Sequence, residues 1–159
     1  MKEGIVDSMV LMHYENGHGQ AIDWWETKVE EGWRLHLSMI TCMERLKGVA
    51  GLPGDRQSTL SAFKSRIQQM KRDGKIFRIY PVTREICKGA YQLIEQYCQR
   101  DTPSPRRNRM EALICDMLIA ATALRYHLVL FTQNLNDYQW ISGLNVEAAN
   151  YEIEEDESS

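Results

Sequence analysis

The sequence predicts a single α/β domain in which a central parallel sheet is flanked by helices on both faces. Short apolar segments alternate with amphipathic segments along the whole chain, and neither a long linker nor an internal repeat divides it. The apolar segments are short and mostly continuous, as expected for strands buried on both faces. We therefore expect one domain over residues 1–151, followed by an acidic and disordered tail over residues 152–159.

The first half of the chain carries two predicted strands and three predicted helices. Residues 4–6 form a short apolar run that ends at an acid, a pattern typical of a buried strand, and a second strand is expected over residues 35–40. Helices are expected over residues 21–31, 41–50 and 60–70. A glycine- and proline-containing segment ends the second of these helices.

The second half continues the alternation. Residues 75–80 alternate well enough for a strand, which Pro81 ends, and residues 86–97 have the spacing of an amphipathic helix. The remaining elements expected, in chain order, are a polar loop over residues 101–108, a helix over 113–124, an apolar strand over 128–131 and a short last strand over 144–146.

The excess of acidic residues in the chain comes from its C-terminal end. The formal net charge is −3, yet five acids lie within residues 152–159, so that residues 1–151 carry +2 without them. A mildly basic domain permits binding to RNA without requiring it.

Composition also indicates the cellular compartment in which the protein is expected. No apolar run approaches the roughly 18 residues that a membrane span needs, and the first residues lack the apolar stretch of a secretory signal. The four cysteines are dispersed without a CxxC pair, which favours thiols in a reducing compartment over disulfides. We therefore expect a cytoplasmic protein with no membrane partner.

Polar side chains follow two of the predicted strands at the point where each strand ends. Asp7 comes directly after the first strand, and Asn134 and Asp137 follow the strand over residues 128–131. In an open parallel sheet, sites form outside the carboxyl ends of the strands. A turn or helix cap is an equally good interpretation of Asp7, and an N-terminal cap is an equally good one of Asp137.

Two further acids lie on predicted helices. Asp116 shares an apolar helix face with Leu113 and Ala120, where an uncompensated charge is costly, so a functional interpretation is favoured. Glu44 borders the buried face of its helix, but Thr41 three residues earlier completes a capping box in which Glu44 would reach back to the Thr41 amide. Taken singly, the cap is the better interpretation of Glu44.

A group of three or four carboxylates repels itself and raises its own pKa values, and a divalent cation removes that penalty. Ligands that are all oxygen select Mg²⁺ or Mn²⁺ over zinc. Such an ion can orient a water, lower its pKa and stabilise the charge on a phosphate. The residues predicted to hold Mg²⁺ (or Mn²⁺) are Asp7, Glu44, Asp116 and Asp137, the last through a bound water, with Asn134 orienting that water or the phosphate.

Four segments resemble the motifs of the PIN domain family. Residues 4–8, Gly-Ile-Val-Asp-Ser, resemble the opening strand, in which the first catalytic aspartate is followed by Thr or Ser. Residues 37–48 are similar to the second motif, a serine strand leading to a glutamate and then a glycine. Residues 115–124 resemble the third, an aspartate followed by an IAA-x-A helix, and residues 130–146 resemble the closing motif. Their order and spacing cover nearly the whole chain.

Within that family, the sequence is similar to the VapC-like toxins of bacterial toxin–antitoxin pairs. The resemblance implies a PIN-like fold and a metal-dependent endoribonuclease that cleaves RNA phosphodiester bonds. It further implies a homodimer and a small antitoxin protein whose segment fills the active groove. Ser8 and Thr132 are expected to orient carboxylates or water.

Two positions depart from the pattern of the family. Met9 stands where the family often has an Asn, and Asn134 stands where many members carry an acid, although an acid three residues later, here Asp137, is also common. These departures support an alternative, a PIN-like module with weakened catalysis that binds RNA or protein, whereas the intact acids of the first three motifs argue against it. A phosphatase or receiver-like domain also places an acid after its first strand, but does not account for Asp116.

Overall fold

The computed structural model describes residues 1–100 and 107–153, and within that part the chain forms a five-stranded parallel sheet and six α-helices. The order of the strands is β3-β2-β1-β4-β5, and every neighbouring pair is parallel. The predicted α/β class and parallel sheet are therefore confirmed. The strands are β1 (Lys2–Val6), β2 (Trp33–Ser38), β3 (Arg78–Tyr80), β4 (Val129–Thr132) and β5 (Val146–Ala148).

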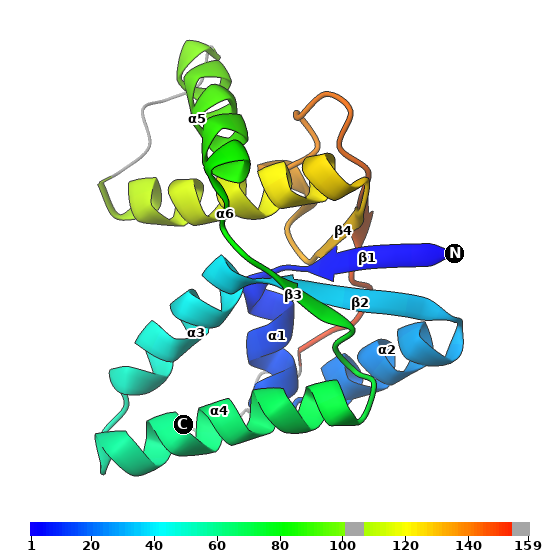
Figure 1. The fold of residues 1–159 in the computed structure, drawn as a ribbon, viewed down its shortest axis with the longest axis vertical. Coiled ribbons are helices and arrows are strands. Elements are labelled where there is room, and N and C mark those ends of the chain that lie inside the picture. The colour runs from blue at the N-terminus through cyan, green and yellow to red at the C-terminus, as the bar shows by residue number, and fades with distance from the viewer. Residues whose placement is uncertain (101–106, 154–159) are drawn as a thin grey trace.

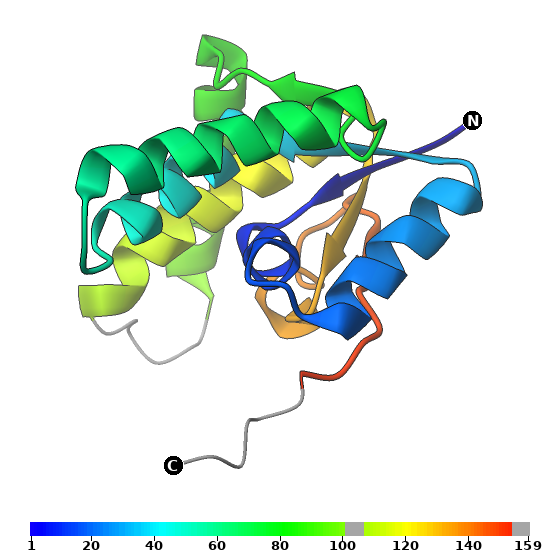
Figure 2. The same cartoon turned by 90° about the horizontal axis from the view of Figure 1, so that it is seen from below.

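Helices cover both faces of the sheet, with α5 and α6 on one side and α1, α2 and α4 on the other (Figures 1 and 2). Successive strand residues point to opposite faces, so Ile5 packs into the core under α5 and α6, whereas Val6 packs into the core against α1 and α2. The helices are α1 (Ser8–Glu15), α2 (Gly19–Glu30), α3 (Met39–Ala50), α4 (Arg56–Arg72), α5 (Arg84–Gln99) and α6 (Arg107–Tyr126), with a 3-10 helix η1 (Leu135–Asp137).

One boundary differs from the prediction in a way that affects the site. β2 ends at Ser38 and α3 begins at once at Met39, with the Ser38 hydroxyl accepting a hydrogen bond from the Ile40 amide at 3.2 Å. Thr41 therefore lies in the first turn of α3, where its hydroxyl is buried without a hydrogen-bond partner among the described residues. The capping box predicted for Thr41 and Glu44 is wrong, because the serine three residues earlier already caps this helix.

The other differences are smaller. α1 was not expected from the sequence, and it follows β1 directly because the intervening residue, Asp7, caps it. The strand expected over residues 75–80 is reduced to β3, and the last strand lies at Val146–Ala148 instead of residues 144–146. Most of the predicted loop at residues 101–108 and residues 154–159 of the predicted tail fall outside the described residues. Among the helices described, none is long and apolar enough to cross a membrane.

The strand that leads to Asp7 passes very close to the strand beside it. Gly4 of β1 pairs with Val129 of β4, and a Cβ at Gly4 would overlap the ring of Phe131 and lie 3.2 Å from the Val129 carbonyl oxygen. The Phe131 ring cannot swing away easily, since it packs edge-on against Trp24 and Trp33 at centroid distances of 5.3 and 4.8 Å. Only glycine fits at this point of β1.

Gly4→Ala is therefore expected to lower the free energy of unfolding by about 1–3 kcal/mol, the usual cost of overpacking a filled core. Gly19→Ala is the matched control, because a Cβ there meets no atom within 4 Å. Urea denaturation followed by circular dichroism measures both. Equal midpoints for the two variants would show that the β1–β4 contact relaxes without cost.

Candidate active site

Four carboxylates from separate segments lie around the carboxyl ends of β1 and β4. Asp7 directly follows β1, Asp137 closes η1 after β4, and Glu44 and Asp116 come from α3 and α6. The Asp7 amide donates a hydrogen bond to the Phe131 carbonyl of β4 at 3.1 Å, so the two strand ends are adjacent. We refer to Asp7, Glu44, Asp116 and Asp137 as the acidic cluster.

Asp7 is buried, with 7% of its surface exposed, and both of its carboxylate oxygens are hydrogen-bonded. Oδ1 accepts from the Val10 amide at 3.1 Å, which caps α1, and Oδ2 accepts from the hydroxyl of Thr132. The cap interpretation of Asp7 is thus confirmed, and the cap fixes the direction of the carboxylate. Burial is the largest influence on the pKa of Asp7 and raises it, while the Thr132 hydroxyl and the backbone amides oppose that rise.

The first residue of α1 holds the carboxylate of Glu44. The Ser8 hydroxyl donates to Glu44 Oε1 at 2.5 Å, a contact that joins α1 to α3. Because Ser8 follows Asp7 directly, this bond places two carboxylates of the acidic cluster near each other. Ser8 and Thr132 therefore orient carboxylates, as the sequence predicted.

Asp116 of α6 is a partly buried carboxylate whose pKa is strongly raised. Burial, and after it the charges of Asp137, Glu44 and Asp7, together raise its pKa to about 7, although a hydrogen bond from the Tyr138 hydroxyl at 3.0 Å opposes the rise. Asp137, Glu44 and Asp7 therefore all lie within electrostatic range of Asp116. Nothing in the sequence singled out Tyr138, because its contact with Asp116 spans 22 residues and depends on the tertiary fold.

Asp137 and Asn134 form a pair of their own at the end of β4. Asn134 Nδ2 donates to Asp137 Oδ2 at 2.7 Å, and the Asp137 carbonyl accepts from the Trp140 indole at 2.8 Å. Asn134, not Asp137, occupies the N-terminal cap position of η1, and Asp137 is its last residue. The N-terminal cap proposed for Asp137 is therefore wrong, since the short helix begins earlier than the sequence suggested.

The chemistry of the acidic cluster fits a hard divalent cation, because its donors are all carboxylate oxygens and two of the acids have raised pKa values from burial and mutual repulsion. Within residues 1–100 and 107–153, however, no three acids, histidines or cysteines converge closely enough to hold an ion. Each carboxylate is turned toward a hydroxyl or amide donor instead. Joint ligation by three of them requires side-chain rotation.

A buried ion pair supports the helix that carries Glu44. Arg45 Nε donates to Glu15 Oε2 at 2.8 Å, and only 1% of the Glu15 side chain is exposed. Arg66 of α4 donates to the Glu15 carbonyl at 3.2 Å, so this acid ties α1, α3 and α4 together. No local pattern in the sequence indicates these contacts, because the two arginines lie 30 and 51 residues from Glu15.

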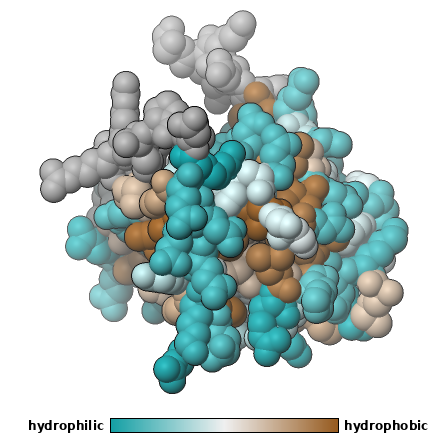
Figure 3. Space-filling view, turned by 90° about the horizontal axis from the view of Figure 1, so that it is seen from above, coloured by the Kyte–Doolittle hydropathy of each residue, from teal (hydrophilic) through white to brown (hydrophobic). Residues whose placement is uncertain are grey.

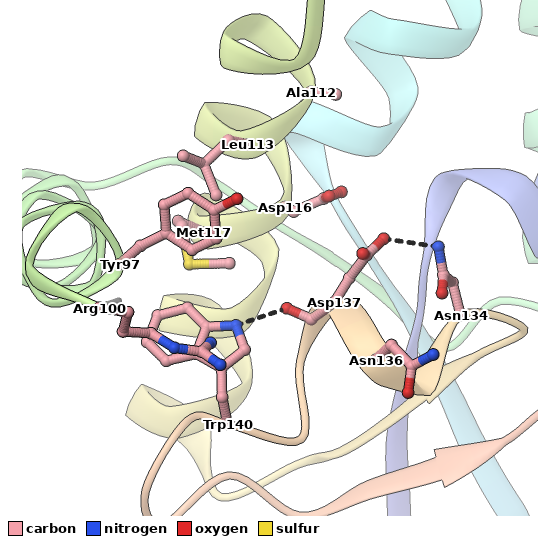
Figure 4. Close-up of a pocket in the computed structure, with 10 residues that line it drawn as sticks. All are labelled: Tyr97, Arg100, Ala112, Leu113, Asp116, Met117, Asn134, Asn136, Asp137 and Trp140. Atoms are coloured by element: carbon pink, nitrogen blue, oxygen red, sulfur yellow. Dashed lines mark hydrogen bonds between the residues drawn. The ribbon is translucent and has the colours of Figure 1, made fainter. Parts of the chain in front are cut away.

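A cavity of about 450 Å³ opens beside the acidic cluster. Asp116 and Asp137 line one side of it, and aromatic, aliphatic and amide side chains from α5, α6 and the η1 segment line the rest (Figure 4). The site therefore combines carboxylates with an adjoining space that can receive part of a ligand.

Comparison with known proteins identifies one family model, the PIN domain, which matches residues 5–138. Among solved structures, VapBC2 from Rickettsia felis bound to a DNA fragment from its promoter is similar with a TM-score of 0.69 at 16% identity, covering 92% of this chain and 98% of that one. DNA-bound VapBC from Salmonella typhimurium gives a TM-score of 0.68 at 18% identity, covering 94% and 100%.

A third similar structure is VapBC-5 from Mycobacterium tuberculosis, described as a member of the VapBC family of toxin–antitoxin systems. Its TM-score is 0.55 at 22% identity, with 93% of this chain and 98% of that one covered. A search of curated proteins finds no match. At these identities the solved structures show the fold, and the PIN model shows the family.

The raised pKa of Asp116 predicts a pH-dependent stability in the absence of divalent cations. Its carboxyl binds a proton more tightly in the folded state, near pH 7, than in the unfolded state, near the ordinary value of 3.8. The folded state therefore holds more protons between these values, and the contribution of Asp116 to the free energy of unfolding falls as pH rises from 4 to 7. Asparagine does not ionise, so in Asp116→Asn the free energy of unfolding should fall by roughly 1–2 kcal/mol less over this range, after allowance for the partial exposure of Asp116.

Thermal unfolding in EDTA at pH 4, 6 and 8 measures this effect. The melting temperature of Asp116→Asn relative to the unsubstituted protein should rise from pH 4 to pH 8. A difference that stays constant over this range would contradict the raised pKa of Asp116.

Arg45→Met is expected to lower the free energy of unfolding by about 3–5 kcal/mol, because it leaves the Glu15 carboxylate buried without its partner. Lys47→Met on the same helix is the matched control, since its ion pair with Glu111 is exposed and contributes little. Chemical denaturation of both variants provides the comparison. Similar stabilities for the two would exclude a structural role for the buried pair.

Proposed function

Because this chain belongs to the PIN domain family, a family of nucleases, we propose that it is a metal-dependent endoribonuclease that cleaves RNA phosphodiester bonds. The observation that carries this proposal is the convergence of Asp7, Glu44 and Asp137 on Asp116 at the carboxyl edge of the sheet, close enough for their charges to raise its pKa. Buried carboxylates that repel one another are stabilised by a shared cation, and oxygen ligands favour Mg²⁺ or Mn²⁺.

In this proposal Asp7, Glu44 and Asp116 hold the cation directly, and Asp137 acts through a bound water. When bound, such an ion would lower the pKa of a water and stabilise negative charge on the phosphate. Asn134, already hydrogen-bonded to Asp137, orients that water or the phosphate. The hydroxyls of Ser8, Thr132 and Tyr138 hold Glu44, Asp7 and Asp116 near the carboxyl edge of the sheet, and these carboxylates would rotate toward the cation when it binds.

We expect RNA cleavage to require each of the three acids that hold the cation directly. Asp7→Asn, Glu44→Gln and Asp116→Asn should each lose at least about a hundredfold in RNA cleavage with Mn²⁺ or Mg²⁺, because each removes a charge that the cation needs. Glu30→Gln, an exposed substitution on α2, is the control and should cleave normally. Cleavage of a labelled single-stranded RNA, resolved on a denaturing gel, measures all four variants.

Two outcomes would contradict this assignment. Absence of cleavage by the unsubstituted protein with either ion would favour a PIN-like module that binds RNA or protein without catalysis. Normal cleavage by Glu44→Gln would remove Glu44 from the site and leave its contact with Ser8 as a structural one.

We further propose that the protein is the toxin of a toxin–antitoxin pair, acts in the cytoplasm, and is a homodimer restrained by a small antitoxin protein. The similarity to VapBC structures supports a protein partner. On the side of α5 and α6, a space-filling view shows hydrophobic residues exposed among hydrophilic ones (Figure 3). Tyr91 of α5 and Ile114 of α6, exposed by 65% and 45%, are available for contact between subunits.

Co-expression with the product of a neighbouring small open reading frame should give a stable complex in which RNA cleavage is inhibited, since the partner's segment would cover the acidic cluster. Expression of the chain alone should slow growth, and Asp116→Asn should relieve that effect. Normal growth together with failure to recover a complex would count against the toxin role while leaving the nuclease assignment standing.

A further inference from the structure

The cavity beside Asp116 and Asp137 has a wall of flat side chains that cation binding does not explain. Trp140 and Tyr97 contribute their rings, with centroids 5.8 Å apart and planes inclined by 53°. The guanidinium carbon of Arg100 lies 4.7 Å from the centre of the Trp140 ring. In Figure 4 these three side chains occupy one side of the cavity, and the two carboxylates face them from the other.

A hydrogen bond and apolar packing hold this wall in place. The Trp140 indole donates to the Asp137 carbonyl at 2.8 Å, which ties the orientation of the ring to a residue of the acidic cluster. Leu113 and Met117 of α6 are buried and form an apolar part of the lining. Aromatic rings are therefore presented at a fixed position relative to the carboxylates.

Amide groups complete the lining. Asn134 and Asn136 both border the cavity, and both are exposed. Asn136 Oδ1 accepts from Gln139 Nε2 at 2.8 Å, which fixes the direction of its amide. An amide carries both a donor and an acceptor, the combination that reads the edge of a base.

We propose that this cavity binds one unstacked nucleobase of single-stranded RNA next to the phosphodiester bond that is cut. The inference rests on the proposed ribonuclease function and names the part of the substrate that this site recognises. Single-stranded RNA is commonly recognised by splaying out a base, stacking it on aromatic or guanidinium planes and bonding its edge. Trp140, Tyr97 and Arg100 supply such planes, and the volume of about 450 Å³ lies in the usual range for small-ligand pockets.

The charges of the lining favour a base over an acidic peptide side chain. Asp116 and Asp137 outnumber Arg100 in the lining and disfavour a carboxylate, whereas a nucleobase is uncharged. Because Arg100, at the end of α5, and Trp140, after η1, line the same cavity, both segments would contact the same nucleotide. Cleavage then depends on a base at one position relative to the cut bond.

The test uses a labelled RNA that the protein cuts, prepared as a series in which a single abasic nucleotide is moved along the strand. With the unsubstituted protein, kcat/KM should fall about tenfold at one position adjacent to the cut and much less elsewhere, as expected for loss of one stacked base. Trp140→Ala should lower kcat/KM for the intact RNA by a similar factor and make the protein indifferent to the abasic nucleotide at that position. Trp140→Phe, which keeps a ring, should restore most of the dependence on the base.

Arg100→Gln provides a second variant that does not depend on the folding of the Trp140 segment, because Arg100 is exposed at the end of α5. It should show a smaller loss with the same positional dependence. Equal effects of the abasic nucleotide on the unsubstituted protein and on Trp140→Ala would overturn the base pocket while leaving cleavage intact. If Trp140→Ala weakens binding of the co-expressed partner but not the dependence on the base, the cavity belongs to the protein partner and the inference fails.

If the protein is not a ribonuclease, no RNA in the series will be cut, and this result is distinct from loss of the base dependence. The same series is then bound to the protein without added metal and followed by fluorescence anisotropy of a labelled strand. A single-position loss of affinity that Trp140→Ala removes would still support the base pocket. Uniform affinity across the series would overturn it.

Discussion

Burying a carboxylate costs hydration free energy, and this chain does so fully at Asp7, after β1, and in part at Asp116 on α6. Hydrogen-bond donors around the two carboxylates offset part of that cost. Thr132 and the first turn of α1 bind Asp7, and the Tyr138 hydroxyl binds Asp116. Both pKa values remain raised because burial outweighs these hydrogen bonds.

The donors come from different elements, so the fold and the site depend on each other. Ser8 at the start of α1 binds Glu44 on α3, and Glu15 at the end of α1 binds Arg45, the next residue of α3. The close approach of β1 to β4 then brings Thr132 beside Asp7. A shift of α3 would change the distance between the carboxylates without altering any of them.

The parts of the structure that depend on local pattern could be predicted from the sequence. Apolar runs located β1 and β4, helical spacing located α4 and α5, and the rule for parallel sheets directed attention to Asp7. The boundary between β2 and α3 was misjudged because Ser38 and Thr41 are both plausible caps, and only the pairing of β2 with β3 decides between them. The contacts of Tyr138 and Arg45 join distant segments, and no local pattern encodes them.

The central claim is that the acidic cluster holds one divalent cation, and direct binding of Mn²⁺ tests it without reference to any substrate. Electron paramagnetic resonance of free Mn²⁺ during a titration gives the number of ions bound. We predict one saturable site in the unsubstituted protein and in Glu30→Gln, and its loss in Asp7→Asn and in Asp116→Asn. Equal Mn²⁺ binding by all four proteins, or none by any of them, would contradict the account.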